Sequence, residues 1–420
     1  MSIRKTLNER LRIYGTNHRL LFSLAFLFFF FSIYEGISSY VTPLIMSQSG
    51  LNYTITGLII GSLSVFGAVF DLVLIKFVTD TTFRRLYLLL FAVALAFPLV
   101  LWQSKHIWMF VLAMVLWGLY YDLRNFGAMD VVGRCTPEKE HASSFGVISI
   151  FKAAGSMLAP LLIGGLVAEG VTKTSLYAPY LALFAAMAMF IVVNVLVRQK
   201  KVCRQYMPSP KITKGSKCIS WLNLSKILYP GLIASLLIAL LDGSLWSLGS
   251  VVSESLESLG VYRGLFLTVN YLPGLFMGWF VGSLTLHYGK LNVAVYSLLV
   301  SFGFLATIYL LQSENVLLLI MMFISGCAQA LVYPSVDGWF ADAISQNGKM
   351  EKDTQALSDF ISNLGYIIAP IFVGLLIDFF GPVQSFSIVG IVGVVLVGIY
   401  LLFIPARVRR NSPNFSATFK

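Results

Sequence analysis

Nine ionisable side chains lie inside long apolar stretches of the sequence, where a charge is costly to place. They are Glu35, Asp71, Asp122, Arg124, Asp130, Lys152, Asp242, Asp337 and Asp359. At membrane depth such a group must face a water-filled cavity or a partner, and it often marks a path for ions or solutes. A carboxylate there can take up and release a proton, and a cation can bind an anionic group. These residue types could therefore exchange protons or bind a solute.

Glu35 and Asp242 stand in matching places, each followed by glycine, in two parts of the chain that repeat. A rise of about 1.5 Å per residue puts both carboxylates roughly 24 Å from the start of their helices, near the middle of a membrane. We expect them to carry protons or to contact the solute. In the competing interpretation each is a structural acid, in a hydrated vestibule or bonded to a hydroxyl such as Ser38 or Ser244.

Four further charged residues are predicted to lie less deep in the membrane than Glu35 and Asp242. The rise per residue puts Asp122 level with Lys152 on neighbouring antiparallel helices, and Arg124 level with Asp71. Because Asp122 and Arg124 are two residues apart, they point to different faces of one helix. The predicted ion pairs are Asp122–Lys152 and Asp71–Arg124. Either cation could instead bind an anionic group on the solute.

The stretches that carry these residues are long enough to span a membrane as helices. The chain is 57% hydrophobic and 12% charged, whereas soluble domains are about half apolar and a quarter charged. About 20 residues of helix cross the hydrocarbon core, with every backbone group bonded within the segment. We expect an all-α membrane fold of twelve helices, at 20–45, 54–77, 84–103, 106–131, 142–167, 175–197, 226–252, 260–284, 290–312, 315–339, 355–379 and 382–405.

The lysines and arginines predict the orientation of these helices. Of the 30 in the chain, only Lys105, Lys173 and Arg263 fall in loops on the side opposite to the termini, and most of the others lie in the tails and loops of the terminal side. Because cytoplasmic loops carry the excess of basic residues, we expect both termini in the cytoplasm. The net charge of +11 then faces an anionic lipid surface, with no need for nucleic acid.

A basic polar segment at 199–225 separates two halves, 1–198 and 226–420, each with six predicted helices. Gly155-x-x-x-Ala159-Pro160-x-x-x-Gly164 recurs as Gly365-x-x-x-Ala369-Pro370-x-x-x-Gly374, and Glu35, Gly57, Gly67 and Asp130 recur as Asp242, Gly264, Gly274 and Asp337. Several coincidences at nearly one offset indicate internal duplication, which is a common construction in transporters.

Loop motifs point to a family. The loop between the second and third predicted helices reads Asp80-Thr81-Thr82-Phe83-Arg84-Arg85, and the corresponding loop of the second half keeps Gly289-Lys290. With twelve spans, a central basic linker and the duplication, these motifs resemble the major facilitator superfamily over essentially the whole chain. The family's drug/proton antiporters carry a proline–glycine element in the fifth helix, but its presence here in both halves favours a role in helix packing.

The resemblance implies gating contacts at the cytoplasmic face. In the family an acid at the end of the fourth helix pairs with a basic residue of the loop motif, which here gives Arg84 with Asp130 and Lys290 with Asp337. The loop acid, Asp80, would lie near the start of the eleventh helix, where an anion is favoured. These contacts would hold the outward-facing state.

The resemblance also implies that the first, fourth, seventh and tenth helices line a central cavity. Six aromatic and amide side chains on these helices are candidates for the solute pocket: Tyr34, Tyr120, Tyr121, Trp246, Gln329 and Tyr333. For any of the aromatic residues the competing interpretation is helix packing or lipid contact.

Motifs for ATP hydrolysis, serine hydrolases and zinc proteases are absent from the sequence, so we expect no enzyme activity, no cofactor and no metal site. The predicted function is secondary active transport of a small organic solute across the plasma or inner membrane, coupled to protons, by alternating access. Facilitated uniport of a metabolite stays open, as does a non-transporting receptor or accessory subunit on the same scaffold. The expected partners are the solute, protons and the lipid bilayer, with the chain as a monomer and no nucleic acid.

Overall fold

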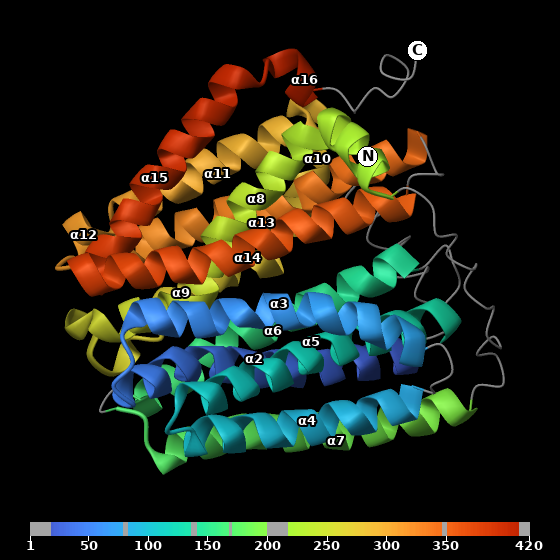
Figure 1. The fold of residues 1–420 in the computed structure, drawn as a ribbon, viewed down its shortest axis with the longest axis vertical. Helices are drawn as coiled ribbons and strands as arrows, with labels where there is room; N and C mark the ends of the chain where they lie inside the picture. The colour runs from blue at the N-terminus through green and yellow to red at the C-terminus, as the bar shows by residue number, and fades with distance from the viewer. Residues whose placement is uncertain are drawn as a thin grey trace. The chain divides into compact units, whose positions relative to one another are not determined.

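The computed structural model describes residues 18–78, 83–135, 141–167, 170–199, 217–346 and 351–410, and the side chains of Asp71 and Asp130 are among those outside the description. Within these ranges the regular structure is helical throughout (Figure 1). The α-helices are α2 (His18–Gln48), α3 (Tyr53–Val78), α4 (Phe83–Gln103), α5 (Ile107–Cys135), α6 (His141–Val167), α7 (Lys173–Gln199), α8 (Lys217–Ser255), α9 (Leu265–Tyr271), α10 (Gly278–Tyr288), α11 (Lys290–Ala306), α12 (Ile308–Leu311), α13 (Asn315–Gln346), α14 (Glu351–Phe380), α15 (Pro382–Phe403) and α16 (Ala406–Arg410). Two 3-10 helices, η2 (Glu257–Tyr262) and η3 (Leu272–Leu275), flank α9.

Most of these helices are long and apolar enough to cross a membrane. In the described part of the chain ten helices meet this condition, and α9, η3 and α10 together form a further span bent by 65°. The shorter apolar helix α11 accounts for the ninth predicted span. Each segment overlaps one of the twelve predicted spans, so the predicted all-α membrane fold is confirmed.

The eighth and ninth spans differ from the straight helices that we predicted. The eighth, expected over 260–284, bends where Pro273 lacks a backbone N–H and Gly274 offers little helix propensity. The ninth breaks at Thr307, whose hydroxyl donates a hydrogen bond to the Phe304 carbonyl at 2.7 Å. A threonine that bonds back to its own helix in this way bends it.

α8 begins earlier than expected. It starts at Lys217, within the segment 199–225 predicted as a linker, and continues to Ser255. Residues 217–225 contain neither glycine nor proline, so nothing in their sequence stops the helix from extending beyond the apolar span. The division of the chain into halves at this segment stays a prediction.

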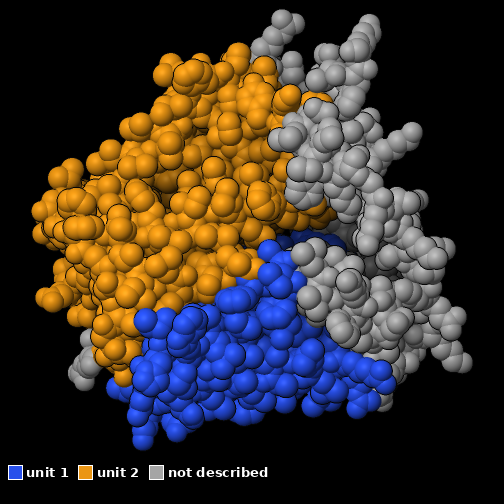
Figure 2. Space-filling model, in the orientation of Figure 1, with its two compact units in different colours: residues 1–38, 66–159, 172–210 blue, residues 39–65, 160–171, 211–420 orange. Residues whose placement is uncertain are grey.

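By their contacts the helices form two compact units, which are coloured in Figure 2. Unit 1 comprises residues 1–38, 66–159 and 172–210, and unit 2 comprises residues 39–65, 160–171 and 211–420. Three helices, α2, α3 and α6, therefore pass from one unit to the other along their length.

In unit 1, α4 packs on α5 and α7, and α4 and α7 lie side by side in Figure 1. α2 crosses α6 closely because glycines face small residues there. A Cβ on Gly36 would overlap the Cβ of Ala159, and one on Gly155 would lie 2.5 Å from the Phe29 carbonyl oxygen. Small residues let two helices approach in this way.

In unit 2, α8 packs on α14, and α11 packs on α13 and α15. The α8–α14 crossing repeats the crossing of unit 1. A Cβ on Gly243 would lie 3.0 Å from that of Ala369, and one on Gly365 would lie 2.5 Å from that of Ala239. The duplicated Gly–Ala–Pro element therefore packs helices in both halves of the sequence, as its recurrence predicted.

Candidate functional site

Glu35 is held by two side chains of α5 in unit 1. Arg124 Nη1 donates to Glu35 Oε1 in a close ion pair, and the Tyr120 hydroxyl donates to the same oxygen at 2.9 Å. Tyr120 and Arg124 are four residues apart, so both face α2 from one side of α5. Arg124 is buried, with 5% of its surface exposed. Burying a charge at such a place requires a partner, which Glu35 supplies.

This pairing differs from the two ion pairs that we predicted from depth. Arg124 binds Glu35, and the side chain of Asp71 lies outside the described residues. No Asp122–Lys152 ion pair forms in the described structure, where the charges acting on Lys152 are those of Arg124 and Glu35. Counting along a helix gives the depth of a residue, but the face that it presents decides its partner, and Arg124 presents its guanidinium to Glu35 of α2.

The three predicted pocket tyrosines of unit 1 have different surroundings. Tyr34 is buried, and its hydroxyl donates to the Ala94 carbonyl at 2.8 Å, which ties α2 to α4. Its role here is packing. Tyr120 contacts Glu35 directly. Tyr121 is half-buried, and its ring centroid lies 5.0 Å from the guanidinium carbon of Arg124, within the range of a cation–π contact.

Asp242 lies in unit 2, where three polar side chains surround its carboxylate. Gln329 Nε2 donates to Asp242 Oδ1 at 3.2 Å, and the Tyr333 hydroxyl donates to Oδ2 at 3.4 Å. The Tyr366 hydroxyl donates to Oδ2 in a short hydrogen bond. The two tyrosine hydroxyls also lie 2.6 Å apart. Two of the predicted pocket residues, from α13, thus meet the predicted acid of α8.

Tyr366 of α14 was not among the predicted site residues. A signal was present, because it follows Gly365 at the start of the repeated Gly–Ala–Pro element, on the helix face that meets α8. Trp246, a predicted pocket residue, lies one turn after Asp242 on α8 and is half-buried. Its position on that face agrees with a place near the acid.

A second group of polar contacts ties the end of α2 to α8 within unit 2. The Tyr40 hydroxyl donates to Glu254 Oε1 at 2.6 Å and to Ser253 Oγ at 3.1 Å. Arg263, just before α9, pairs with Glu254 Oε2 at 3.4 Å. Glu254 was missed by the sequence analysis because it lies beyond the predicted end of its span.

At the same end of unit 2, Asp378 of α14 caps the start of α3. Its carboxylate accepts hydrogen bonds from the backbone N–H groups of Tyr53 and Thr54, each at 2.8 Å, and from the Thr54 hydroxyl at 2.6 Å. The first N–H groups of a helix have no partner within it, and an anion near that end is favoured.

Two glycine contacts join the same elements and repeat between the halves. A Cβ on Gly57 of α3 would overlap the Pro370 carbonyl of α14, and a Cβ on Gly264, just before α9, would overlap the Pro160 carbonyl of α6. Each glycine therefore lets one helix of the first half meet one segment of the second half directly. A larger residue at Gly57 or Gly264 would prevent so close an approach of the two segments.

The predicted gating contact of the second half, between Lys290 and Asp337, does not form. Lys290 Nζ donates to the Gly338 carbonyl at 2.8 Å and pairs with Asp342 Oδ1 at 2.6 Å, so its predicted pairing with Asp337 is wrong. Gly338 and Asp342 are four residues apart on one face of α13, and Asp337 points elsewhere, within electrostatic range of Asp359.

The predicted gating contacts of the first half, Arg84 with Asp130 and Asp80 near the eleventh helix, fall partly outside the described residues. Arg84 is exposed at the start of α4, while Asp80 and the side chain of Asp130 lie outside the described residues.

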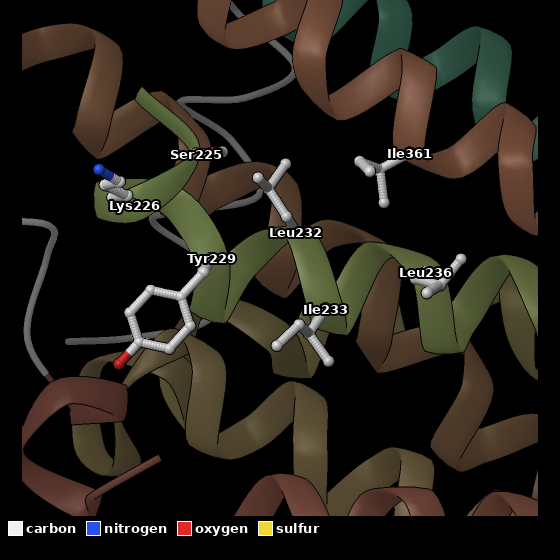
Figure 3. A pocket seen from close by; sticks show the side chains of 7 residues that line it. All are labelled: Ser225, Lys226, Tyr229, Leu232, Ile233, Leu236 and Ile361. Carbon is white, nitrogen blue, oxygen red and sulfur yellow. The ribbon is translucent and has the colours of Figure 1, made fainter. Parts of the chain in front are cut away.

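A hollow of about 480 Å³ lies on unit 2 beside the first part of α8. Its lining is Ser225, Lys226, Tyr229, Leu232, Ile233, Leu236 and Ile361. Figure 3 shows that Ile361 alone comes from another helix, α14, while the other six side chains follow α8. Its lining is mostly aliphatic and contains no acid, so it has fewer groups for proton exchange or solute binding than the surroundings of Asp242.

The sequence matches the family model of the Major Facilitator Superfamily over residues 20–350 and again over residues 231–419. The chain belongs to the major facilitator superfamily. The predicted resemblance is confirmed, and the protein is a multi-pass membrane protein of a transporter family. No curated protein matches the sequence.

Solved structures of transporters share the fold of this superfamily member. A bacterial homologue of the human lysosomal transporter Spinster, inward-facing and unoccupied, matches with a TM-score of 0.70 and 13% identity, covering 95% of this chain and 99% of that one. The nucleoside transporter NupG matches at 0.69 and 14%, over 91% and 98%. The peptide transporter POT in complex with sulfate matches at 0.69 and 14%, over 94% and 96%. At these identities the likeness is one of fold.

Proposed function

We propose that this protein is a secondary active transporter of a small organic solute, coupled to protons and working by alternating access in the plasma or inner membrane. Membership of a transporter superfamily supports solute transport. Similar folds named as nucleoside and peptide transporters support a small organic molecule as the cargo.

The surroundings of Asp242 are the observation that carries the proton coupling. Its carboxylate accepts hydrogen bonds from neutral donors only, and none of the described Lys and Arg side chains forms an ion pair with it. A charged carboxylate inside a membrane is costly unless a cation balances it. Binding a proton removes that cost, so Asp242 is suited to carry one.

The hydroxyl pair beside Asp242 accommodates both forms of the acid. Tyr333 and Tyr366 are each donor and acceptor, and either hydroxyl can donate to the other across 2.6 Å. With Asp242 ionised, both can donate to the carboxylate. With Asp242 protonated, the acid can donate to Tyr366, which then donates to Tyr333. The proton can therefore enter and leave without leaving a buried polar atom unpaired.

The contacts at the end of unit 2 support alternating access. Gly57, Gly264 and Asp378 join helices of the first sequence half to segments of the second through noncovalent contacts. Carboxylate caps and glycine contacts can form and separate as discrete states, which a rocking motion of two halves requires.

Solute-dependent proton movement is the test of this proposal. Purified protein is placed in vesicles loaded with a pH-sensitive dye, and amino acids, dipeptides, nucleosides and organic acids are added in turn without an imposed gradient. At least one solute should change the lumenal pH in wild-type vesicles and leave it unchanged in vesicles with Asp242→Asn or without protein.

Other outcomes would favour the competing functions. A solute that crosses with no proton movement would favour facilitated uniport. The absence of flux for every solute, together with the recovery of a specific protein partner, would favour a receptor or accessory subunit.

A further inference from the structure

Lys152 is a half-buried cation on α6 that forms no ion pair with the described acidic side chains. Among the described residues no acid lies within ion-pair distance of its ammonium group, and the charges that act on it are those of Arg124 and Glu35. Of these two, Arg124 acts more strongly. The positive charge of Arg124 therefore acts on Lys152 within unit 1, and Glu35, the acid that also acts on Lys152, is already bound to Arg124. Such an arrangement within a membrane attracts an anion.

One hydrogen-bond donor of Arg124 is unpaired in the described structure. Its Nη1 donates to Glu35, and its Nη2 donates to Asn125 Oδ1 at 3.2 Å. Its Nε is buried and has no hydrogen-bond partner in the described structure. Buried donors without a partner are rare in native proteins, and each one calls for a ligand or another explanation.

Neighbouring rings hold the arginine in place. The Tyr121 ring lies under the guanidinium at 5.0 Å and stacks on Trp117, with ring centroids 6.2 Å apart. Trp117 is buried. Because the guanidinium is fixed on one side by a ring and on another by Glu35, little ordering is needed when a ligand binds.

We propose that Lys152 and Arg124 bind an anionic group of the transported solute, with a carboxylate as the preferred ligand. The inference rests on the transport function proposed above and names the substrate class: an organic acid or a zwitterion rather than a neutral or purely cationic solute. The planar fork of an arginine matches the two oxygens of a carboxylate, and the lysine supplies a second, mobile point charge. All the residues concerned lie in unit 1.

Glu35 and the anion of the solute compete for Arg124 under this proposal. Substitutions at the two neighbouring positions should therefore act in opposite directions. Lys152→Gln removes a charge that binds the anion. The affinity of the protein for the anion should therefore fall by about 10- to 100-fold, the range for a charged hydrogen bond. Glu35→Gln removes the competitor, and the affinity should rise. A purely structural role would give no such opposition.

Calorimetry on the purified full-length chain in detergent tests the inference, with sulfate, benzoate and benzamide as probes at matched ionic strength in chloride. Sulfate and benzoate should bind to the wild type and benzamide should not. Lys152→Gln should weaken this binding by about 10- to 100-fold, Lys152→Arg should retain most of it, and Glu35→Gln should strengthen it. Lys226→Gln, an exposed lysine of unit 2, is the matched control and should bind as the wild type does.

The inference is overturned if neither anion binds, if benzamide binds as tightly as benzoate, or if Lys152→Gln and Lys226→Gln bind alike. This readout needs no flux. Anion binding that depends on Lys152 in a protein that moves no solute would contradict the transport function alone, while flux of neutral solutes without anion binding would contradict the substrate class alone.

Discussion

Glu35 and Asp242 occupy matching positions in the two halves of the sequence but have different surroundings. Glu35 forms an ion pair with Arg124 and accepts a hydrogen bond from Tyr120, so its charge is balanced. Asp242 meets only neutral donors. A duplicated acid has thus acquired two chemical settings, one suited to holding a cation in place and the other to exchanging a proton.

Asp242→Asn should separate proton movement from solute movement. The amide oxygen can still accept from Tyr366, so we expect the protein to fold with a thermal unfolding temperature close to that of the wild type. The amide cannot exchange the proton, so solute-driven pH changes should disappear while exchange of labelled solute across the membrane stays within about threefold. Loss of both activities in a well-folded variant would assign Asp242 to solute binding instead.

At the scale of single residues, the sequence indicated which charges are buried but not which of them meet. The apolar context of Arg124 predicted burial, and helical rise predicted its depth. Its partner depends on how α2, α3 and α5 are rotated about their axes, which only packing decides. Lys290 gives the same lesson, because the adjacent Asp337 and Gly338 present different faces of α13.

At the scale of elements, the repeated Gly–Ala–Pro segments of α6 and α14 have two separate uses. Their glycine and alanine let α2 cross α6 and α8 cross α14. Their prolines meet Gly264 and Gly57, which belong to neither crossing. Helix existence and length were predictable because membrane thickness sets them, and the bend of the eighth span follows from its Pro–Gly pair. The second use of the prolines involves segments far apart in sequence and could not be predicted.

Gly57→Ala should weaken the α3–α14 contact and open that end of unit 2. A Cβ would overlap the Pro370 carbonyl, and overpacking of this kind costs about 1–3 kcal/mol. Spin labels at Ser49 and Phe379, both exposed, should show a new population at longer distance, and transport should slow.

The matched control for this substitution is Gly303→Ala in α11, where an added Cβ meets nothing within 4 Å. Alanine is a better helix former than glycine, so this variant should keep the wild-type distance and transport rate. Equal distance distributions in the two variants would mean that the glycine contact does not determine how that end closes.

At the scale of the whole molecule, the distribution of charge and the membership of a transporter superfamily point to one account. Basic residues gather in the predicted cytoplasmic segments, and polar side chains inside the spans surround Glu35 in one unit and Asp242 in the other. The sequence repeat predicted that both places would matter. Among the polar partners of Asp242, Tyr366 became visible only once α14 was packed against α8.

Accumulation of solute under an imposed pH difference tests the central claim most directly. Vesicles carrying the protein are given a difference of one pH unit, in either direction, with a solute that the dye assay has identified. Coupling to one proton predicts accumulation of up to about tenfold in one direction of the gradient, because one pH unit corresponds to about 1.36 kcal/mol. A protonophore should abolish it. Solute that only equilibrates, whatever the pH difference, would contradict the account.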